Sequence, residues 1–271
     1  MATPDVPIAK WVGRPRSYTS GRKARQPSVI VIHTTDGSER PTSAEDGAAY
    51  DKTRTDGTST HFFVDSTGVV QELEISDEAH AARAHGNDIG IQIEVCGLAR
   101  QTAAQWADDA SKKTLEWLAQ LCVQLRRLGY YPTRRLSPAE LRGSWNSGSP
   151  RGFCGHVDIT NAFPEDKGTH TDPGPSFPWT WLFNRINELE DDSVNSADID
   201  KIADLVIEKL TKPTALKGAD GKPDGTESTL VGHHVLSQGI PNPFKGGKRT
   251  AAYELIGDIA EAVQASKTTG Q

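Results

Sequence analysis

Two histidines and an aspartate stand where they could bind a metal ion. His156 lies in the run Cys-Gly-His-Val-Asp-Ile, and Asp172 lies in Thr-Asp-Pro-Gly-Pro. His33 lies far upstream, directly after the apolar run Val-Ile-Val-Ile. Imidazole nitrogens and a carboxylate suit zinc, and three protein ligands leave a fourth position for water, as in catalytic zinc sites. We therefore predict that these three residues bind one zinc ion.

Cys154 is an alternative ligand. It stands two residues before His156, so on a strand the two side chains would share a face. A thiolate is also a good zinc donor, and residue chemistry alone leaves this choice open. The three cysteines, Cys96, Cys122 and Cys154, are odd in number and irregularly spaced, which indicates buried thiols and no disulfide framework.

Two predicted strands would position the chemistry. Residues 28–33 form a short β-branched run typical of a buried strand, and it ends at His33. In residues 89–95 apolar residues at odd positions alternate with Gly, Gln and Glu. This period of two places Glu94 on the face opposite the isoleucines, toward whatever lies over the sheet.

The remaining patterns predict an α/β fold, in which a mixed central β-sheet is flanked by helices and carries a zinc cleft at one face. A hairpin is indicated by the runs 61–64 and 69–73 around Asp-Ser-Thr-Gly. Helical patterns occupy 43–52, 102–128 and 179–189, and Ser-Pro-Ala-Glu at residue 137 is typical of a helix start. Residues 143–175, dense in Gly, Pro, Ser and Asn, predict a long functional loop.

The chain divides into four predicted parts. Residues 1–27 read as an irregular N-terminal arm, 28–190 as the zinc domain, and 191–197 as a polar linker. Residues 198–271 read as a small helical C-terminal region. Within that region we expect amphipathic helices over 199–210 and 250–265, separated by a flexible stretch over 214–228.

Composition excludes several classes of function. With 271 residues, a net charge of −6 and a pI near 5.8, the chain is not expected to bind nucleic acid. No run approaches the ~20 apolar residues that span a bilayer, so we expect no stable membrane insertion. The first ten residues lack the apolar core of a secretory signal, and we expect synthesis in the cytoplasm.

Six segments carry a resemblance to a known family. They are Val29–His33, Ser59–Phe62, Ala79–Ala81, Asn87–Gly97, Gly155–Ile159 and Thr171–Trp179. In this order the chain resembles the zinc-dependent N-acetylmuramoyl-L-alanine amidases of the peptidoglycan-recognition and phage-lysozyme type. The resemblance implies that His33, His156 and Asp172 bind the zinc, with Asp172 in place of the alternative Cys154.

The resemblance also implies catalytic and substrate-binding roles. In an ungapped register Glu94 takes the general-base position and Gln92 replaces a usual glycine; an alternative register would put Gln92 at the base position. His170 stands where such enzymes often carry lysine, which implies that it stabilises the oxyanion. An imidazolium can donate that hydrogen bond, but its charge depends on pH. Tyr50 and His80 are candidate residues of the substrate groove.

The implied activity is zinc-dependent hydrolysis of the amide bond between N-acetylmuramic acid and L-alanine in bacterial peptidoglycan. The resemblance further suggests a phage endolysin, made in the host cytoplasm and reaching the wall after a holin opens the membrane. Alternatives are a non-catalytic peptidoglycan-recognition module and a bacterial wall-recycling amidase. The C-terminal region would then serve wall binding or oligomerisation, and the oligomeric state stays open.

Overall fold

The computed structural model describes residues 3–22, 26–129, 131–193 and four short stretches, 213–217, 223–229, 240–241 and 249–250. The chain divides into two compact units, Met1–Glu190 and Asp191–Gln271. Every residue predicted to take part in chemistry lies in the first unit. None of the helices among the described residues is long and apolar enough to cross a membrane.

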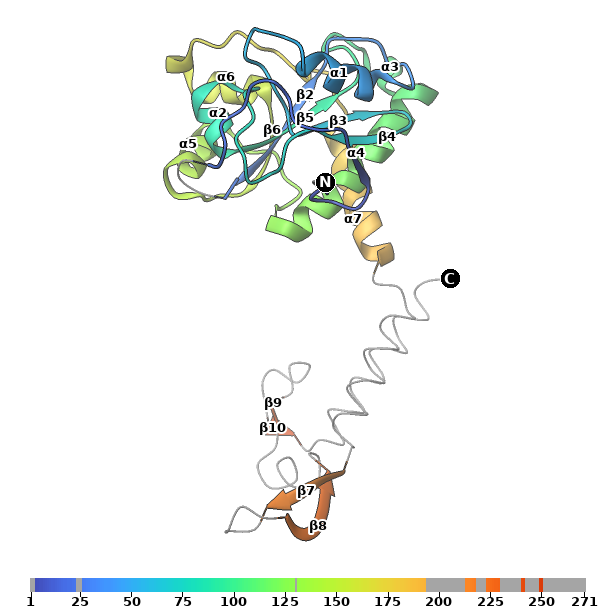
Figure 1. The fold of residues 1–271 in the computed structure, drawn as a ribbon, viewed down its shortest axis with the longest axis vertical. Helices are drawn as coiled ribbons and strands as arrows, with labels where there is room; N and C mark the ends of the chain where they lie inside the picture. The colour runs from blue at the N-terminus through green and yellow to red at the C-terminus, as the bar shows by residue number, and fades with distance from the viewer. Residues whose placement is uncertain are drawn as a thin grey trace. The chain divides into compact units, whose positions relative to one another are not determined.

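A six-stranded sheet forms the centre of the first unit (Figure 1). The strands lie in the order β1-β4-β3-β5-β2-β6, and every neighbouring pair is parallel except the hairpin β3–β4. Their bounds are β1 Ala9–Trp11, β2 Val29–Thr34, β3 Phe62–Asp65, β4 Gly68–Gln71, β5 Gly90–Val95 and β6 Gly152–Gly155. The mixed sheet predicted from the sequence is therefore confirmed.

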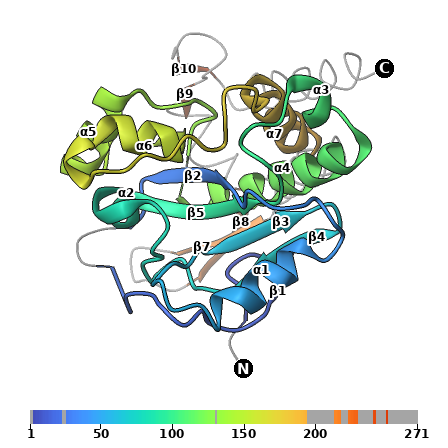
Figure 2. The ribbon, with the colours of Figure 1, turned by 90° about the horizontal axis from the view of Figure 1, so that it is seen from above.

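Helices cover both faces of this sheet (Figure 2). Their bounds are α1 Ser43–Asp51, α2 Arg83–Ile89, α3 Ala103–Trp106, α4 Asp109–Gly129, α5 Pro138–Ser147, α6 His156–Ala162, the 3-10 turn η1 Pro164–Asp166, and α7 Trp179–Ser193. α4 and α7 lie on one face, while α1 and α6 lie on the other (Figure 1). The site described below lies on the face of α1 and α6.

Alternation along β2 and β5 decides which side chains reach that face. The even-numbered residues Ile30 and Ile32 of β2 pack into the largest core with Ile91 and Ile93 of β5. The odd-numbered Val29 and Val31 of β2 pack into a second core on the opposite face, together with residues of α2, α5 and α6. His33 continues the odd-numbered row beyond this second core.

The N-terminal arm was predicted to be irregular, and this is wrong in part. β1 lies within it and pairs in parallel with β4, with Ala9 opposite Val69. A strand of three residues at a sheet edge shows no alternation that a sequence pattern could detect. Its partner lies about sixty residues away, so the pairing is a tertiary property.

The predicted loop over residues 143–175 is also corrected. It contains the end of α5, the strand β6, the helix α6 and the turn η1. Each of these elements is short, and β6 reads as Gly-Phe-Cys-Gly, which offers little strand propensity. β6 forms because its backbone pairs with β2, with Gly152 opposite Val29.

The second unit differs from the predicted helical region in its described residues. β7 Pro213–Lys217 and β8 Pro223–Thr229 form an antiparallel pair where a flexible stretch was expected. β9 Ile240–Pro241 pairs with β10 Arg249–Thr250. The helix expected over 199–210 lies outside the described residues, as does nearly all of the one expected over 250–265. α7 runs to Ser193, into the predicted linker.

Candidate metal centre

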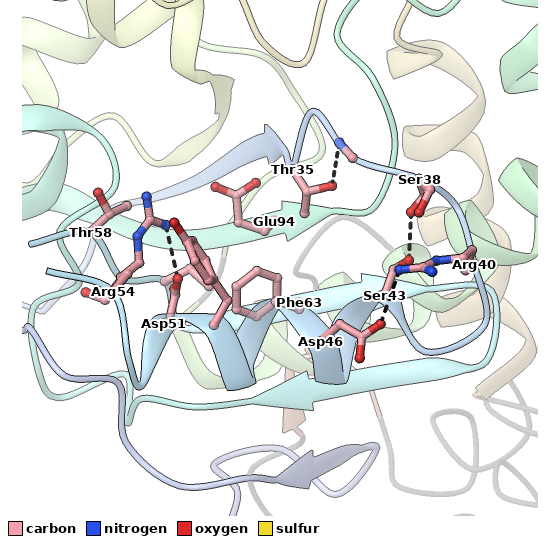
Figure 3. Close-up of a pocket in the computed structure, with 15 residues that line it drawn as sticks. Thr35, Ser38, Arg40, Ser43, Asp46, Asp51, Arg54, Thr58, Phe63 and Glu94 are labelled. Atoms are coloured by element: carbon pink, nitrogen blue, oxygen red, sulfur yellow. Dashed lines mark hydrogen bonds and ion pairs between the residues drawn. The ribbon is translucent and has the colours of Figure 1, made fainter. Parts of the chain in front are cut away.

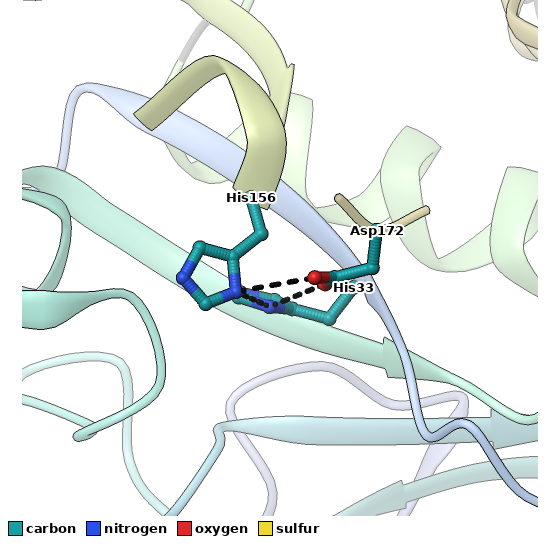
Figure 4. Close-up of side chains that lie close together, drawn as sticks. All are labelled: His33, His156 and Asp172. Atoms are coloured by element: carbon teal, nitrogen blue, oxygen red, sulfur yellow. Dashed lines mark hydrogen bonds and ion pairs between the residues drawn. The ribbon is translucent and has the colours of Figure 1, made fainter. Parts of the chain in front are cut away.

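His33, His156 and Asp172 meet in one cluster (Figure 4). His33 lies near the end of β2, His156 is the first residue of α6, and Asp172 lies in the loop before α7. The two Nδ1 atoms are 3.1 Å apart. Asp172 Oδ2 lies 3.2 Å from His33 Nδ1, and Asp172 Oδ1 lies 3.5 Å from His156 Nδ1. Three potential ligand atoms from distant parts of the chain therefore surround one point.

The spacing of these atoms fits a zinc ion. With zinc–ligand bonds of ~2.0–2.1 Å, tetrahedral ligand atoms lie about 3.3 Å apart, close to the three distances above. Two Nδ1 lone pairs facing each other at 3.1 Å also require a proton or a cation between them. The cluster supplies three ligands, one fewer than tetrahedral zinc takes, and so leaves a position for water.

The electrostatics of the cluster favour a positive charge at the same point. Burial opposes protonation of His33, but the hydrogen bond to Asp172 and the charge of Glu94 outweigh it and raise the pKa of His33 to about 9. Burial lowers the pKa of His156 to about 4. Burial also opposes ionisation of Asp172, yet hydrogen bonds from His156 and His33 hold the pKa of that carboxyl well below its usual range.

Backbone contacts bring Asp172 to His156. Val157 N donates to Asp172 O at 3.0 Å, which ties the loop to the first turn of α6. Gly155 permits this approach, because a Cβ at that position would lie 2.5 Å from Cδ of Pro173 and 3.2 Å from the Asp172 carbonyl oxygen. The glycine of the Gly-His-Val-Asp run is therefore required by close packing against the Asp-Pro turn.

Asp158 and Arg135 hold the start of α6, and the sequence alone did not assign either residue a role. Asp158 Oδ2 accepts from Gly155 N at 2.8 Å. Arg135 donates to both carboxylate oxygens of Asp158 at 2.7 Å. This bidentate ion pair fixes the turn that carries His156.

Cys154 does not join the metal cluster. It is fully buried on β6 in the second core, near Val31 and Ile159. Burial raises the pKa of the Cys154 thiol well above its usual value, so the thiolate that zinc would need is disfavoured. The geometry thus favours Asp172 over Cys154 as the third ligand, a choice that residue chemistry had left open.

The two polar residues of β5 occupy different environments. Glu94 is paired in register with His33 and lines the cavity over the cluster. Its Oε2 is buried without a hydrogen-bond partner among the described residues, and burial raises the pKa of Glu94 to about 7. Gln92 is fully buried, and its Oε1 lies 2.8 Å from His33 Nε2. Of the two residues, Glu94 therefore faces the cavity over the cluster, whereas Gln92 lies buried beside His33.

His170 lies at the mouth of the cluster. Its ring stacks on His156 with centroids 3.9 Å apart, and its Nδ1 lies 3.7 Å from Asp172 Oδ1. The side chain is 45% exposed and lines the same cavity as Glu94. An imidazole in this position can donate a hydrogen bond to a bound substrate.

Comparison with known proteins identifies the family. Residues 23–175 match the family described as N-acetylmuramoyl-L-alanine amidase, a span that includes all five residues discussed as ligands or catalytic groups. The chain belongs to this family. It is therefore an enzyme, an amidase acting on peptidoglycan, as the sequence resemblance predicted. No curated protein matches the chain.

Solved structures with similar folds include other amidases and lytic enzymes. A hydrolase of Staphylococcus aureus, AmiA, in complex with its ligand is 18% identical, covers 68% of this chain and 84% of its own, and has a TM-score of 0.48. A selenomethionine derivative of AmpD is 21% identical over 69% of this chain and 99% of its own, with a TM-score of 0.42. The catalytic domain of XlyA is 18% identical over 66% and 99%, with a TM-score of 0.42.

Two adjoining cavities flank the catalytic face of the amidase. The first, of about 910 Å³, lies over the metal cluster. The second, of about 380 Å³, lies over α1 and is lined by Arg54, Phe63 and Glu94 (Figure 3). It also contains Tyr50, which is 59% exposed. Both are lined by Thr35, Arg54, Thr58 and Glu94. The two cavities therefore meet beside Glu94.

Arg54 lines both cavities, and sequence reasoning did not identify it. It donates to Asp51 at 3.1 Å and to Asp56 at 2.7 Å. Its guanidinium lies 5.0 Å from the centroid of the Tyr50 ring. Two carboxylates already neutralise its charge, so Arg54 shapes the groove more than it attracts an anion.

His80 occupies a position that gives no support to its predicted role in the substrate groove. Its Nε2 lies 2.9 Å from Thr19 Oγ1, and its Nδ1 lies 3.3 Å from the Gly57 carbonyl oxygen. Both ring nitrogens are thus occupied by neighbouring loops, and the residue lines neither of the two cavities. His61 is fully buried, and its Nδ1 accepts from the backbone N of Gln92.

Proposed function

We propose that this amidase uses one zinc ion, held by His33, His156 and Asp172, to cleave the bond between the lactyl group of N-acetylmuramic acid and L-alanine. The observation that carries the proposal is the spacing of the three ligand atoms, 3.1, 3.2 and 3.5 Å. Zinc supplies a Lewis acid that polarises the scissile carbonyl and lowers the pKa of a water molecule.

Glu94 transfers protons during the reaction, and His170 donates a hydrogen bond to the scissile carbonyl. Glu94 accepts a proton from the attacking water at Oε2, which has no hydrogen-bond partner among the described residues. The same carboxyl gives that proton to the nitrogen of L-alanine as the carbon–nitrogen bond breaks. His170 donates a hydrogen bond to the carbonyl oxygen as negative charge develops there.

Tyr50 extends the site away from the scissile bond. Its exposed ring lies in the cavity that meets the metal cavity beside Glu94 and Arg54. A substrate with its scissile bond over the cluster would extend past Arg54 and contact the Tyr50 ring. A non-catalytic recognition module would need the groove. It would not need the three metal ligands or the carboxylate of Glu94 beside them.

The test is digestion of purified peptidoglycan with and without a chelator. We expect new L-alanine amino termini, their loss with the chelator, and their return with added zinc. Glu94→Gln is expected to lower the rate by about 10²–10⁴-fold, because glutamine cannot accept the proton. New reducing sugar ends in place of amino termini would show a different bond to be cleaved.

We also propose that the amidase acts in host lysis as a phage endolysin, made in the host cytoplasm and released to the wall by a holin. The support is its resemblance to the phage-lysozyme type. Expression inside a bacterium should cause rapid lysis only when a holin is co-expressed. Lysis at the same rate without a holin would contradict this route.

A further inference from the structure

Gln92 makes a contact that neither the catalytic scheme nor the resemblance assigns. It stands at the position where the resemblance has glycine. Its side chain is fully buried on the face of β5 that also carries Glu94. Gln92 Oε1 lies 2.8 Å from Nε2 of His33, the ring nitrogen that points away from the metal cluster.

The partners of the Gln92 amide fix its orientation. Gln92 Nε2 donates to the Gly86 carbonyl oxygen at 2.9 Å, and a carbonyl can only accept. The amide oxygen must therefore face His33, so His33 Nε2 must carry a proton. A neutral His33 then has its lone pair on Nδ1, the atom that lies 3.1 Å from His156 Nδ1 and 3.2 Å from Asp172.

The surroundings of Gln92 keep the amide in place. Gly90 leaves the room it needs, because a Cβ there would lie 2.3 Å from Gln92 Nε2 and 2.7 Å from the Gly86 carbonyl oxygen. The backbone N of Gln92 donates to His61 Nδ1 at 2.9 Å. His61 is itself fully buried, so this contact holds β5 in addition to its pairing with β2 and β3.

We propose that Gln92 is a positioning residue, which holds His33 in the tautomer and ring orientation that present Nδ1 to the metal. This inference rests on the proposed zinc site. Partners of the outer ring nitrogen orient a metal-bound histidine and raise its basicity. A neutral amide does this here without adding a second negative charge beside Glu94.

The test measures zinc affinity, by competition with a chromogenic chelator, in full-length variants. Gln92→Met keeps the length of the side chain but removes the acceptor, and we expect about 10–100-fold weaker zinc binding. In Gln92→Glu a protonated carboxyl can keep both bonds, donating to the Gly86 carbonyl and accepting from His33, and this variant is expected to bind zinc more tightly than Gln92→Met. Equal affinity in Gln92→Met and the wild type would overturn the proposal.

A second measurement separates this proposal from the zinc proposal. In the wild type the His33 Nε2 proton should be visible by NMR and exchange slowly with water, with or without zinc, because it is buried and hydrogen-bonded. In Gln92→Met it should exchange rapidly. If the wild type bound no zinc but showed this protected proton, the zinc site would fail and the role of Gln92 in orienting His33 would stand. A rapidly exchanging proton in the wild type would refute that role.

Glu94→Gln is the matched control, since it changes the next residue on the same face of β5. It should lose hydrolysis, and it should weaken zinc binding less than Gln92→Met does. If it weakened zinc binding as much as Gln92→Met, the effect would reflect general disturbance of the site and the proposal would fall. Thermal unfolding in chelator confirms that each variant is folded before its affinity is interpreted.

Discussion

The metal centre has two halves that are built differently. The strand-borne half consists of His33, Gln92 and Glu94, which lie on the adjacent parallel strands β2 and β5. The loop-borne half consists of His156, His170 and Asp172, which follow β6 or precede α7. In the first half the backbone ladder sets which residues lie opposite one another. In the second half a few specific contacts do so.

This difference indicates where the site is sensitive. The register of β2 and β5 places His33 opposite Glu94 through a ladder of six residue pairs, so one altered side chain cannot shift it. In the loop-borne half, Asp172 reaches the cluster through one backbone hydrogen bond from Val157 and the close contact at Gly155. Small changes there should disturb function without unfolding the sheet.

Within the loop-borne half, the largest effect is expected at His170, its most exposed member. His170→Ala removes a hydrogen-bond donor from the developing oxyanion and should lower kcat by about a hundredfold. Zinc affinity should change little, because His170 is not in the ligand cluster. Peptidoglycan digestion and chelator competition on the same preparation give both values.

His170→Lys is the matched comparison, because lysine also donates a hydrogen bond and keeps its charge at higher pH. We expect it to retain most of the wild-type activity. If the alanine and lysine variants were equally impaired, the contribution of His170 would come from its stacking on His156 and not from donation.

Gly155→Ala should have a smaller effect, which acts through metal binding. The added Cβ would meet Pro173 Cδ at 2.5 Å and move the Asp-Pro turn away from His156. Misplacing one ligand should weaken zinc binding by about tenfold. Gly68→Ala is the control, since nothing lies within 4 Å of its added Cβ. If both variants bound zinc like the wild type, the packing at Gly155 would not control the loop-borne half.

The sequence predicted the strand-borne half well, for a physical reason. A period of two along residues 89–95 places Glu94 on the opposite face from Ile91 and Ile93, and the structure has this arrangement. A run ending at His33 likewise predicted the end of a strand. Alternation is a local property of the chain, so it can be read without knowing the fold.

The loop-borne half and the supporting contacts were harder to predict. Arg135 and Asp158 are separated by 23 residues, and nothing in either segment signals their pairing. α2 was missed because Arg83–Ile89 is short, contains Gly86 and has no N-cap hydrogen bond from a side chain. The role of Gln92 depends on the Gly86 carbonyl and on His33, which no pattern in β5 specifies. These features are tertiary contacts.

The smallest effect concerns a buried carboxyl beneath the strand-borne half. Glu72 is fully buried; it accepts from Thr60 N at 3.0 Å, and its backbone N donates to the His61 carbonyl oxygen. Burial, reinforced by the charge of Asp51, raises the pKa of Glu72 above its ordinary value of 4.5. The folded state thus binds a proton that the unfolded state releases, and stability falls as pH rises above that ordinary value.

Glu72→Gln removes this titration and keeps the shape of the side chain. It should therefore be more stable than the wild type at about pH 8, by on the order of 1 kcal/mol, and should lose this advantage near pH 5. Urea unfolding at both pH values measures the difference, with Glu188→Gln on the exposed face of α7 as the control. Zinc affinity should not change, since Glu72 lies outside the ligand cluster. An equal difference in stability at both pH values would mean that folding does not raise the pKa of Glu72.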